Sequence, residues 1–237
     1  MKIALIGYGK MGKTIHTLLE KQADVEVFIL EKERPSNWEA LLAQCDVAIE
    51  FTSPDTAVGN LLDCFRLGVP VVTGSTGWMG DYERVKQACE SHQGTLFYAS
   101  NFSLGVQLFN RVNRYAARLL ASFPEYKISI EEIHHIHKKD KPSGTAVTLA
   151  QVILDERPDY QGFALNEEAS ASQIPINAVR EADVFGIHSS VFTGPTDEIA
   201  IIHTAFGREG FAAGAITAAR FLQGKKGIFT MNDLLPL

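Results

Sequence analysis

Residues 1–31 read MKIALIGYGKMGKTIHTLLEKQADVEVFILE, and this stretch decides the fold. The apolar run at residues 3–6 predicts a parallel strand that is covered on both faces. The glycine motif GYGKMG follows at residues 7–12, and apolar side chains then recur at helical spacing through residues 14–21. A strand, a glycine loop and a helix in this order are typical of a dinucleotide-binding Rossmann domain.

Each glycine of this motif has a physical role. Glycine permits the tight turn, the close approach of the backbone to a pyrophosphate, and close packing of the helix against the strand. The phosphates would face the N-terminus of the helix. Because glycines are common at such turns for steric reasons alone, the motif by itself is a weak signal. The candidate cofactor contacts in the motif are Gly7, Tyr8, Gly9, Lys10, Met11 and Gly12.

The end of the second predicted strand supplies another cofactor signal. Residues 25–30 are mostly apolar and lead into Glu31, about 20 residues beyond the glycine motif, where an acidic residue contacts the adenosine ribose hydroxyls. A solvated glutamate in the charge run EKER is the alternative for Glu31 taken alone. Lys32 and Arg34 follow and could hold a 2′-phosphate, so the pattern leaves NADH and NADPH both open.

Helix and strand patterns alternate through residues 38–99. This repetition predicts a doubly wound parallel sheet, whose ligands bind beyond the carboxyl ends of the strands. Two predicted strand ends carry small or polar residues, FTSP at 51–54 and GSTGW at 74–78. Such residues leave room for a flat nicotinamide ring, although ordinary turns have the same composition. Their position at the ligand edge favours the functional interpretation.

The pattern changes after residue 102. The predicted elements there are a helix at 105–121, strands at 126–133, 183–192 and 198–206, and a final helix at 210–222. The turn GPTD at 194–197 predicts that the last two strands form an antiparallel hairpin. We therefore predict an α/β chain with a Rossmann domain (1–102 and 208–237) and a second α+β domain (103–207), built on a mixed or antiparallel sheet.

The densest chemical signal is EEIHHIHKKDKPSGTA at residues 131–146, where three of the seven histidines fall within four residues. A zinc site is one interpretation, because imidazole binds zinc readily. Three lysines in the stretch oppose a bound cation, so we expect no metal and favour an anion site. Ser143 can cap a helix that Gly144 and Thr145 open, and the free N–H groups of that helix would face a carboxylate. A nearby histidine or lysine could then protonate a substrate that accepts hydride.

Composition restricts the class of partner. The 22 basic and 28 acidic side chains give a formal net charge of −6, which offers no broad attraction to nucleic acid or to an anionic membrane. Cys45, Cys64 and Cys89 stand singly, which argues against a disulfide framework and predicts a reducing, cytoplasmic compartment. We expect neither a signal peptide nor a membrane span, because the apolar runs are too short.

Five motifs together resemble one family. They are GYGKMG at 7–12, EFTSP at 50–54, VTGSTGW at 72–78, ASNFSLGV at 99–106 and EIHHIHKKDKPSGTA at 132–146. In this combination the chain is similar to the dihydrodipicolinate reductase family of bacterial lysine biosynthesis, from its first residue to its last helix. The histidine, lysine and PSGTA block is highly specific, whereas many dehydrogenases share the glycine motif.

The resemblance implies NAD(P)H-dependent reduction of 4-hydroxy-tetrahydrodipicolinate, or its dehydrated form, to tetrahydrodipicolinate. It implies acid/base catalysis by His134, proton donation by Lys138, and a homotetramer formed through the sheet of the second domain. The implied contacts to the small dicarboxylate substrate are His135, Ser143, Gly144, Thr145 and Arg180. The implied cofactor contacts beyond the glycine motif are Glu31, Lys32, Phe51, Thr52, Gly74, Ser75, Thr76, Ser100, Asn101 and Phe102.

Other functions fit part of the pattern. An aspartate or homoserine dehydrogenase would share the fold, and a non-catalytic NAD(H)-sensing module would need the glycine loop but no proton donor. Neither explains the His-His-x-His-Lys run followed by PSGTA at 134–146. Lys32 stands where the family often has an arginine for the 2′-phosphate, and the stretch from Glu31 to Cys45 is shorter than in many members. The use of both NADH and NADPH is therefore our hypothesis.

Overall fold

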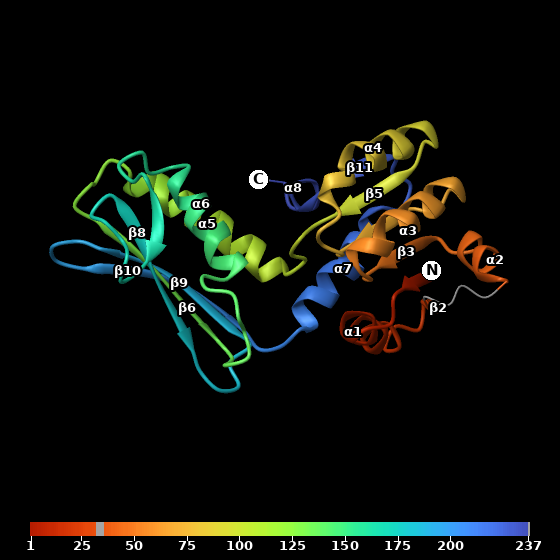
Figure 1. The fold of residues 1–237 in the computed structure, drawn as a ribbon, viewed down its shortest axis with the longest axis horizontal. Coiled ribbons are helices and arrows are strands. Elements are labelled where there is room, and N and C mark those ends of the chain that lie inside the picture. Colours follow the sequence, from red (N-terminus) through yellow and green to blue (C-terminus); the bar gives the residue numbers. More distant parts are fainter. Residues whose placement is uncertain (32–35, 237) are drawn as a thin grey trace. The chain divides into compact units, whose positions relative to one another are not determined.

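The computed structural model describes residues 1–31 and 36–236 and divides into two compact units (Figure 1). The first unit comprises Met1–Ser103 and Arg208–Leu237, and the second comprises Leu104–Gly207. Within the described part of the chain, no helix combines the length and the apolar content needed to cross a bilayer.

A parallel sheet of six strands, in the order β11-β5-β4-β3-β1-β2, forms the centre of the first unit. Its strands are β1 (Lys2–Ile6), β2 (Glu26–Leu30), β3 (Val47–Glu50), β4 (Val71–Thr73), β5 (Thr95–Tyr98) and β11 (Gly227–Phe229). The chain runs outward from β1 to β2 and then returns to β3 on the other side of β1. In a doubly wound sheet such a reversal opens a crevice at the carboxyl ends of the two strands, where ligands bind.

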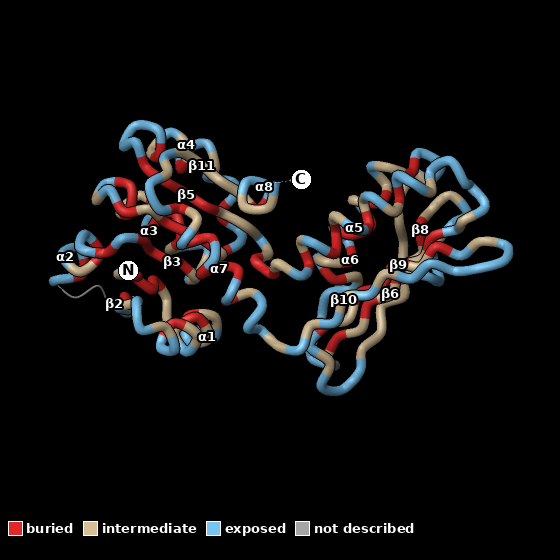
Figure 2. The backbone as a smooth tube through the Cα atoms, turned by 180° about the vertical axis from the view of Figure 1, so that it is seen from behind, coloured by how far each residue is buried: buried red, intermediate tan, exposed pale blue. Residues whose placement is uncertain are grey.

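Helices cover the two faces of this sheet. They are α1 (Lys10–Leu19), α2 (Trp38–Ala43), α3 (Pro54–Arg66), α4 (Tyr82–Ser91), α7 (Glu209–Phe221) and α8 (Met231–Leu234), with the 3₁₀ helix η1 (Met79–Asp81). α1 packs against α7, and α3 packs against α4. The strands β1 and β3 are buried nearly throughout, as their apolar runs predict, and Figure 2 shows buried residues along the central strands.

The second unit is a mixed sheet with two helices. Its strands, in the order β10-β9-β6-β8-β7, are β6 (Lys127–His134), β7 (Gly162–Leu165), β8 (Gln173–Arg180), β9 (Gly186–Thr193) and β10 (Glu198–Ala205). β9 pairs antiparallel with β6 and β10, whereas β8 pairs parallel with β6 and β7. α5 (Leu104–Leu120) and α6 (Gly144–Leu154) pack against each other and share a core with the sheet, which includes Ile128, Leu149 and Phe192.

The predicted fold class is confirmed, including the hairpin of β9 and β10, and the differences from the prediction are local. α1 begins at Lys10, inside the glycine motif, rather than after it. The helical pattern of residues 57–67 predicts a start at Ala57, but α3 begins at Pro54, because proline is well suited to the first helical turn. The strand predicted from residue 183 begins at Gly186, because Asp183 adopts a φ of 61° that a strand does not allow. β7, β8, β11 and α8 were not predicted.

Candidate active site

The glycine loop lies at the reversal point between β1 and β3. Gly7 has a φ of +94°, and a Cβ there would stand 2.3 Å from the carbonyl oxygen of Phe51. A Cβ at Gly12 would stand 2.2 Å from the carbonyl oxygen of Gly7. Gly9 is different, because a Cβ there would meet no atom within 4 Å. Gly7 and Gly12 are therefore needed for packing, whereas Gly9 leaves open space in front of the N-terminus of α1.

That open space belongs to a cleft of about 770 Å³. It is lined by Ile6, Gly7, Tyr8, Gly9, Leu30, Glu31, Phe51, Thr52, Ser53, Asp55, Thr56, Gly59 and Asn60. The volume is within the range of small-molecule and cofactor sites. No side chain caps α1, so its first N–H groups point at this space and suit a phosphate. The volume of the cleft and the uncapped N-terminus of α1 fit a dinucleotide.

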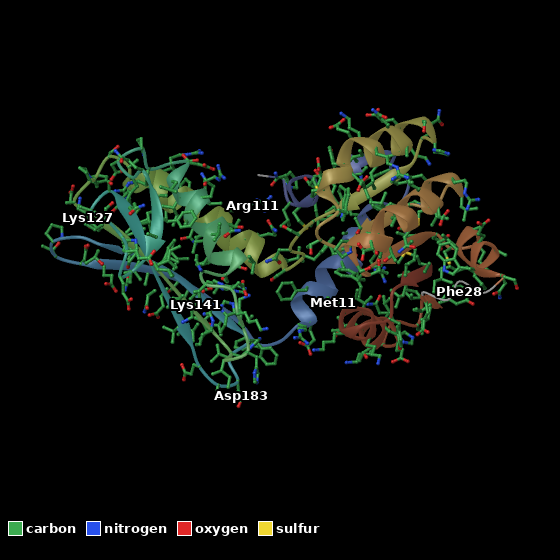
Figure 3. All side chains as sticks on the ribbon, viewed as in Figure 1. Met11, Phe28, Arg111, Lys127, Lys141 and Asp183 are labelled. Carbon is green, nitrogen blue, oxygen red and sulfur yellow. The ribbon has the colours of Figure 1, made fainter. Side chains whose placement is uncertain are left out.

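The predicted cofactor contacts that the structure describes fall into three groups. Gly7, Tyr8, Gly9, Glu31, Phe51 and Thr52 line the cleft. Lys10, Met11 and Gly12 form the first turn of α1, where Figure 3 labels Met11. Gly74, Ser75, Thr76, Ser100, Asn101 and Phe102 follow β4 and β5 and lie outside the cleft lining. Lys32 and Arg34 lie outside the described residues.

A buried glutamate that we did not predict organises the neighbouring loops. Glu50, at the end of β3, is completely buried and accepts hydrogen bonds from Thr52 N at 3.0 Å, from the Ser75 hydroxyl at 3.0 Å, and from the hydroxyls of Thr52 and Thr73. The Ser75 hydroxyl also accepts from Thr52 N at 2.8 Å. Gly74 leaves room for the Phe51 ring, since a Cβ there would stand 2.0 Å from it. Glu50 thereby joins two of the predicted cofactor loops.

In the second unit, the register of three strands brings a polar cluster together. Side chains two apart on a strand share a face, so Glu132 and His134 of β6 lie on the same side of the sheet. His188 of β9 stands opposite Glu132, and Arg180 of β8 stands opposite His134. The rings of His134 and His188 meet edge to face, with centroids 4.9 Å apart.

Glu132 is the centre of this cluster. Its carboxylate accepts from Ser143 N at 3.0 Å and from Arg180 at 3.2 Å. It also lies 3.3 Å from Nδ1 of His134 and 3.9 Å from Nε2 of His188. Burial alone would raise the pKa of Glu132, but the hydrogen bonds from His134, Ser143 and Arg180 outweigh it and lower the pKa to about 2. Glu132 is therefore ionised at neutral pH.

The loop after β6 carries the predicted proton donor. Nζ of Lys138 lies 2.8 Å from Oδ2 of Asp140, and this contact holds the pKa of Asp140 below its usual range. Arg180 donates to the carbonyl oxygens of Lys138, at 3.1 Å, and of Asp140. The loop continues through Lys141, labelled in Figure 3. Arg180 thus fixes both Glu132 and the loop that presents Lys138.

The predicted anion site lies at the start of α6. The buried Ser143 hydroxyl accepts a hydrogen bond from Ala146 N at 3.2 Å and thereby caps the helix. The same hydroxyl lies 3.2 Å from Nε2 of His188. The N–H groups of Gly144 and Thr145 donate no hydrogen bond to any described residue outside the helix. A Cβ at Gly144 would meet nothing within 4 Å. These two N–H groups are therefore available to donate to an anion, as a predicted carboxylate site at a helix N-terminus requires.

Models of two family segments match nearly the whole chain. The model described as "Dihydrodipicolinate reductase, N-terminus" matches residues 1–102, and "Dihydrodipicolinate reductase, C-terminus" matches residues 105–235. The chain belongs to the dihydrodipicolinate reductase family.

Relatives of this family are similar over their full length. A protein of Christiangramia forsetii named 4-hydroxy-tetrahydrodipicolinate reductase is 44% identical over 99% of this chain and 98% of its own length. A protein of the same name from Methanoregula boonei is 34% identical over 100% of this chain and 98% of its own. The solved structure of dipicolinate-bound dihydrodipicolinate reductase from Paenisporosarcina sp. TG-14 has a TM-score of 0.80, 24% identity and 99% coverage of both chains, which shows the shared fold.

In this member of the dihydrodipicolinate reductase family, one set of residues could also ligate a metal. Ligand atoms of Glu132, His134 and His188 all lie within 4.8 Å of one another. The guanidinium of Arg180, 3.2 Å from Glu132, opposes a cation there. The absence of a bound metal remains our prediction.

Sequence reasoning missed Glu50, Glu132 and His188. A signal for Glu132 was present, because the spacing Glu132-x-His134 on a strand places both side chains on one face. Nothing in the sequence indicates that His188 pairs with them, since that depends on the register of β9 against β6. β6 ends at His134, so His135 and His137 lie in the loop that follows this strand.

Proposed function

We propose that this chain reduces 4-hydroxy-tetrahydrodipicolinate to tetrahydrodipicolinate with NADPH or NADH, in the diaminopimelate route to lysine. The observation that carries the proposal is the second-unit site, where buried His134 and the loop bearing Lys138 accompany two free N–H groups at the start of α6. An aspartate or homoserine dehydrogenase, or an NAD(H)-sensing module, would not need this combination.

In this proposal the first unit binds the cofactor. When bound, the reduced nicotinamide supplies a hydride. The N–H groups at the start of α1 bind the pyrophosphate, and Glu31 accepts hydrogen bonds from the adenosine ribose. The residues assigned to the nicotinamide end are Phe51, Thr52, Gly74, Ser75, Thr76, Ser100, Asn101 and Phe102.

The second unit binds the dicarboxylate and supplies a proton. The overall reaction consumes one hydride and one proton and releases one water. Gly144 and Thr145 bind a substrate carboxylate through their N–H groups, with His135, Ser143 and Arg180 assigned to the same substrate pocket. His134 and Lys138 hold and move the proton, because an imidazole and an ammonium group can each donate a proton to a bound substrate.

The test follows absorbance of the reduced nicotinamide, with substrate generated from pyruvate and aspartate semialdehyde by a condensing enzyme. We expect cofactor oxidation only in the complete mixture. His134→Gln and Lys138→Met should each lower kcat by roughly 10²–10⁴-fold, the usual contribution of a general acid, without changing the Kd of the cofactor. Lys139→Met, which removes a charge from an exposed neighbour, is the control. Near-normal turnover in both variants would remove these catalytic assignments.

Cofactor choice is a separate part of the proposal. A lysine at position 32 offers a point charge rather than the fork of a guanidinium, so we expect weak discrimination of the 2′-phosphate. Values of kcat/KM for NADH and NADPH should agree within about tenfold. A hundredfold preference in either direction would contradict dual use.

We further propose a homotetramer in the cytoplasm. β10 forms an edge of the second sheet, and its Ile199 and Ile202 side chains are 43% and 63% exposed. Apolar side chains on an exposed edge strand favour self-association. Cys45, Cys64 and Cys89 are buried thiols rather than disulfides, which suits a reducing compartment. Light scattering should give four times the 26.0 kDa chain mass, and Ile202→Lys should lower it; a monomeric wild type would refute the tetramer.

A further inference from the structure

The two oxygens of the Glu132 carboxylate have different partners. Oε1 accepts from the N–H of Ser143 at 3.0 Å and from Arg180 at 3.2 Å. Oε2 lies 3.3 Å from Nδ1 of His134 and 3.9 Å from Nε2 of His188. A backbone donor and a guanidinium therefore hold one oxygen, while the other oxygen is directed at the imidazole rings.

The contact between Glu132 and His134 determines where the imidazole proton lies. Oε2 of Glu132 and Nδ1 of His134 are both buried and lie 3.3 Å apart, and no other described residue offers either atom a hydrogen bond. An ionised carboxylate can only accept hydrogen bonds, so the two atoms satisfy each other only when Nδ1 carries a proton. Leaving both unsatisfied in the interior would be costly. Nε2 is then the nitrogen that gains or loses a proton.

The surroundings of Nε2 are consistent with this role. A Cβ at Gly186, the β9 residue opposite His134, would stand 3.1 Å from Nε2 and 3.3 Å from Cδ2. The glycine therefore leaves the side of the ring that carries Nε2 uncovered by a side chain. Nδ1, by contrast, is fully enclosed on the side of Glu132.

We propose that Glu132 is a positioning residue that keeps a proton on Nδ1 of His134 and so makes Nε2 the atom that exchanges a proton with the substrate. The inference rests on the proposed function, because it assigns one part of that proton-transfer step. In the step, the Nε2–H bond of the imidazolium breaks, the proton bonds to the substrate atom made electron-rich by hydride, and the ring keeps its Nδ1 proton.

Other charged and titratable groups also face His134. Arg180 comes from β8, His188 comes from β9, and the Lys138 and Asp140 pair comes from the loop after β6. Burial and the neighbouring His134 lower the pKa of His188 to about 4, so His188 is neutral near pH 7 and adds packing rather than charge. Of the groups around His134, Glu132 is the one whose acceptor atom reaches Nδ1.

The decisive variant is Glu132→Gln. The amide oxygen would keep the donors Ser143 N–H and Arg180, so the amide NH₂ would point at Nδ1 of His134. A donor there favours the opposite tautomer, with the proton on Nε2. The matched control is Glu131→Gln, because Glu131 is the preceding residue on β6, lies on the other face, and accepts from Asn177 at 2.8 Å.

Two measurements test the idea. In ¹⁵N-histidine-labelled protein, with His134→Gln to assign the signal, the wild type and Glu131→Gln should show neutral His134 protonated on Nδ1, and Glu132→Gln should show it protonated on Nε2. In the reductase assay, Glu132→Gln should lower kcat by on the order of tenfold or more with little change in KM, and should move the alkaline limb of the kcat/KM profile to lower pH, because the imidazolium that donates the proton loses its neighbouring carboxylate.

The outcomes separate this inference from the proposed function. An Nε2 proton in the wild type, or the same tautomer and pH profile in wild type and Glu132→Gln, would overturn the inference. A wild type without reductase activity would overturn the proposed function, while the tautomer measurement would still decide the role of Glu132. If Glu132→Gln does not fold, Glu132→Asp takes its place, since its shorter side chain withdraws the carboxylate from Nδ1 of His134 and should weaken the Nδ1 preference.

Discussion

Acidification should destabilise this protein through one buried histidine. His188 is 5% exposed, and burial together with the nearby His134 lowers its pKa to about 4 from an ordinary 6.5. Between these two pKa values, His188 is protonated in the unfolded chain but neutral in the folded protein. The stability associated with neutral His188 is fully present above pH 6.5 and is lost as the pH falls through 4.

The size of the effect follows from the two pKa values. One pKa unit corresponds to 1.36 kcal/mol, so a shift from 6.5 to about 4 amounts to about 3 kcal/mol when the loss is complete. Between pH 7 and pH 5, where Glu132 with a pKa of about 2 is still ionised, the expected loss is about 2 kcal/mol. Substitution of His188 by Gln removes the titrating group and therefore this part of the pH dependence.

The assay is urea unfolding at pH 7 and pH 5, followed by far-UV circular dichroism. Tryptophan fluorescence would not report unfolding of the second unit, which contains His188, because Trp38 and Trp78 both lie in the first unit. The wild type should lose about 2 kcal/mol more than His188→Gln over this interval. Ser189→Ala, the next residue on β9 and without a titrating group, should keep the wild-type dependence. Equal losses in wild type and His188→Gln would refute the reasoning.

Three further predictions concern other parts of the structure. Gly12→Ala should lower the free energy of unfolding by about 1–3 kcal/mol or more, because the new Cβ would stand 2.2 Å from the Gly7 oxygen. Gly9→Ala should leave Tm unchanged, because its Cβ meets no atom within 4 Å, and should raise the cofactor Kd by filling that space. Glu50→Gln should lower Tm and raise the cofactor KM together, since it disturbs both loops; a change in neither would contradict its role. Ser143→Ala should cost about 1 kcal/mol of stability in thermal unfolding through loss of the helix cap, and no loss would refute that role.

The sequence carries most of the information about the first unit because its signals are local. Residues 3–21 contain a continuous apolar run, three glycines and a helical repeat. In this order the three patterns indicate a strand, a tight loop and a helix. β8 was missed for a local reason as well, since Pro175 normally marks an edge strand, yet β8 lies between β6 and β7. The three-residue β11 is too short to show any periodicity.

The candidate site divides in the same way. His134, Lys138, Ser143 and Gly144 are close in sequence, so their grouping could be predicted from the pattern and from the family resemblance. His188 lies far from them along the chain and joins them only through the register of β9. Register depends on the whole hydrophobic pattern and on turn geometry, which no short motif contains.

Both units place a buried glutamate at or near the end of a central strand, and this placement has a common physical reason. Loops that follow neighbouring strands have backbone N–H groups and hydroxyls without ladder partners, and a carboxylate accepts several of them at once. Glu50 joins the loops after β3 and β4 through neutral donors, whereas Glu132 joins the start of α6 and the end of β8 and includes the cation Arg180. The hydrogen bonds from His134, Ser143 and Arg180 keep Glu132 charged, so a neutral replacement at 132 should change proton transfer, whereas one at 50 should change loop geometry and cofactor binding.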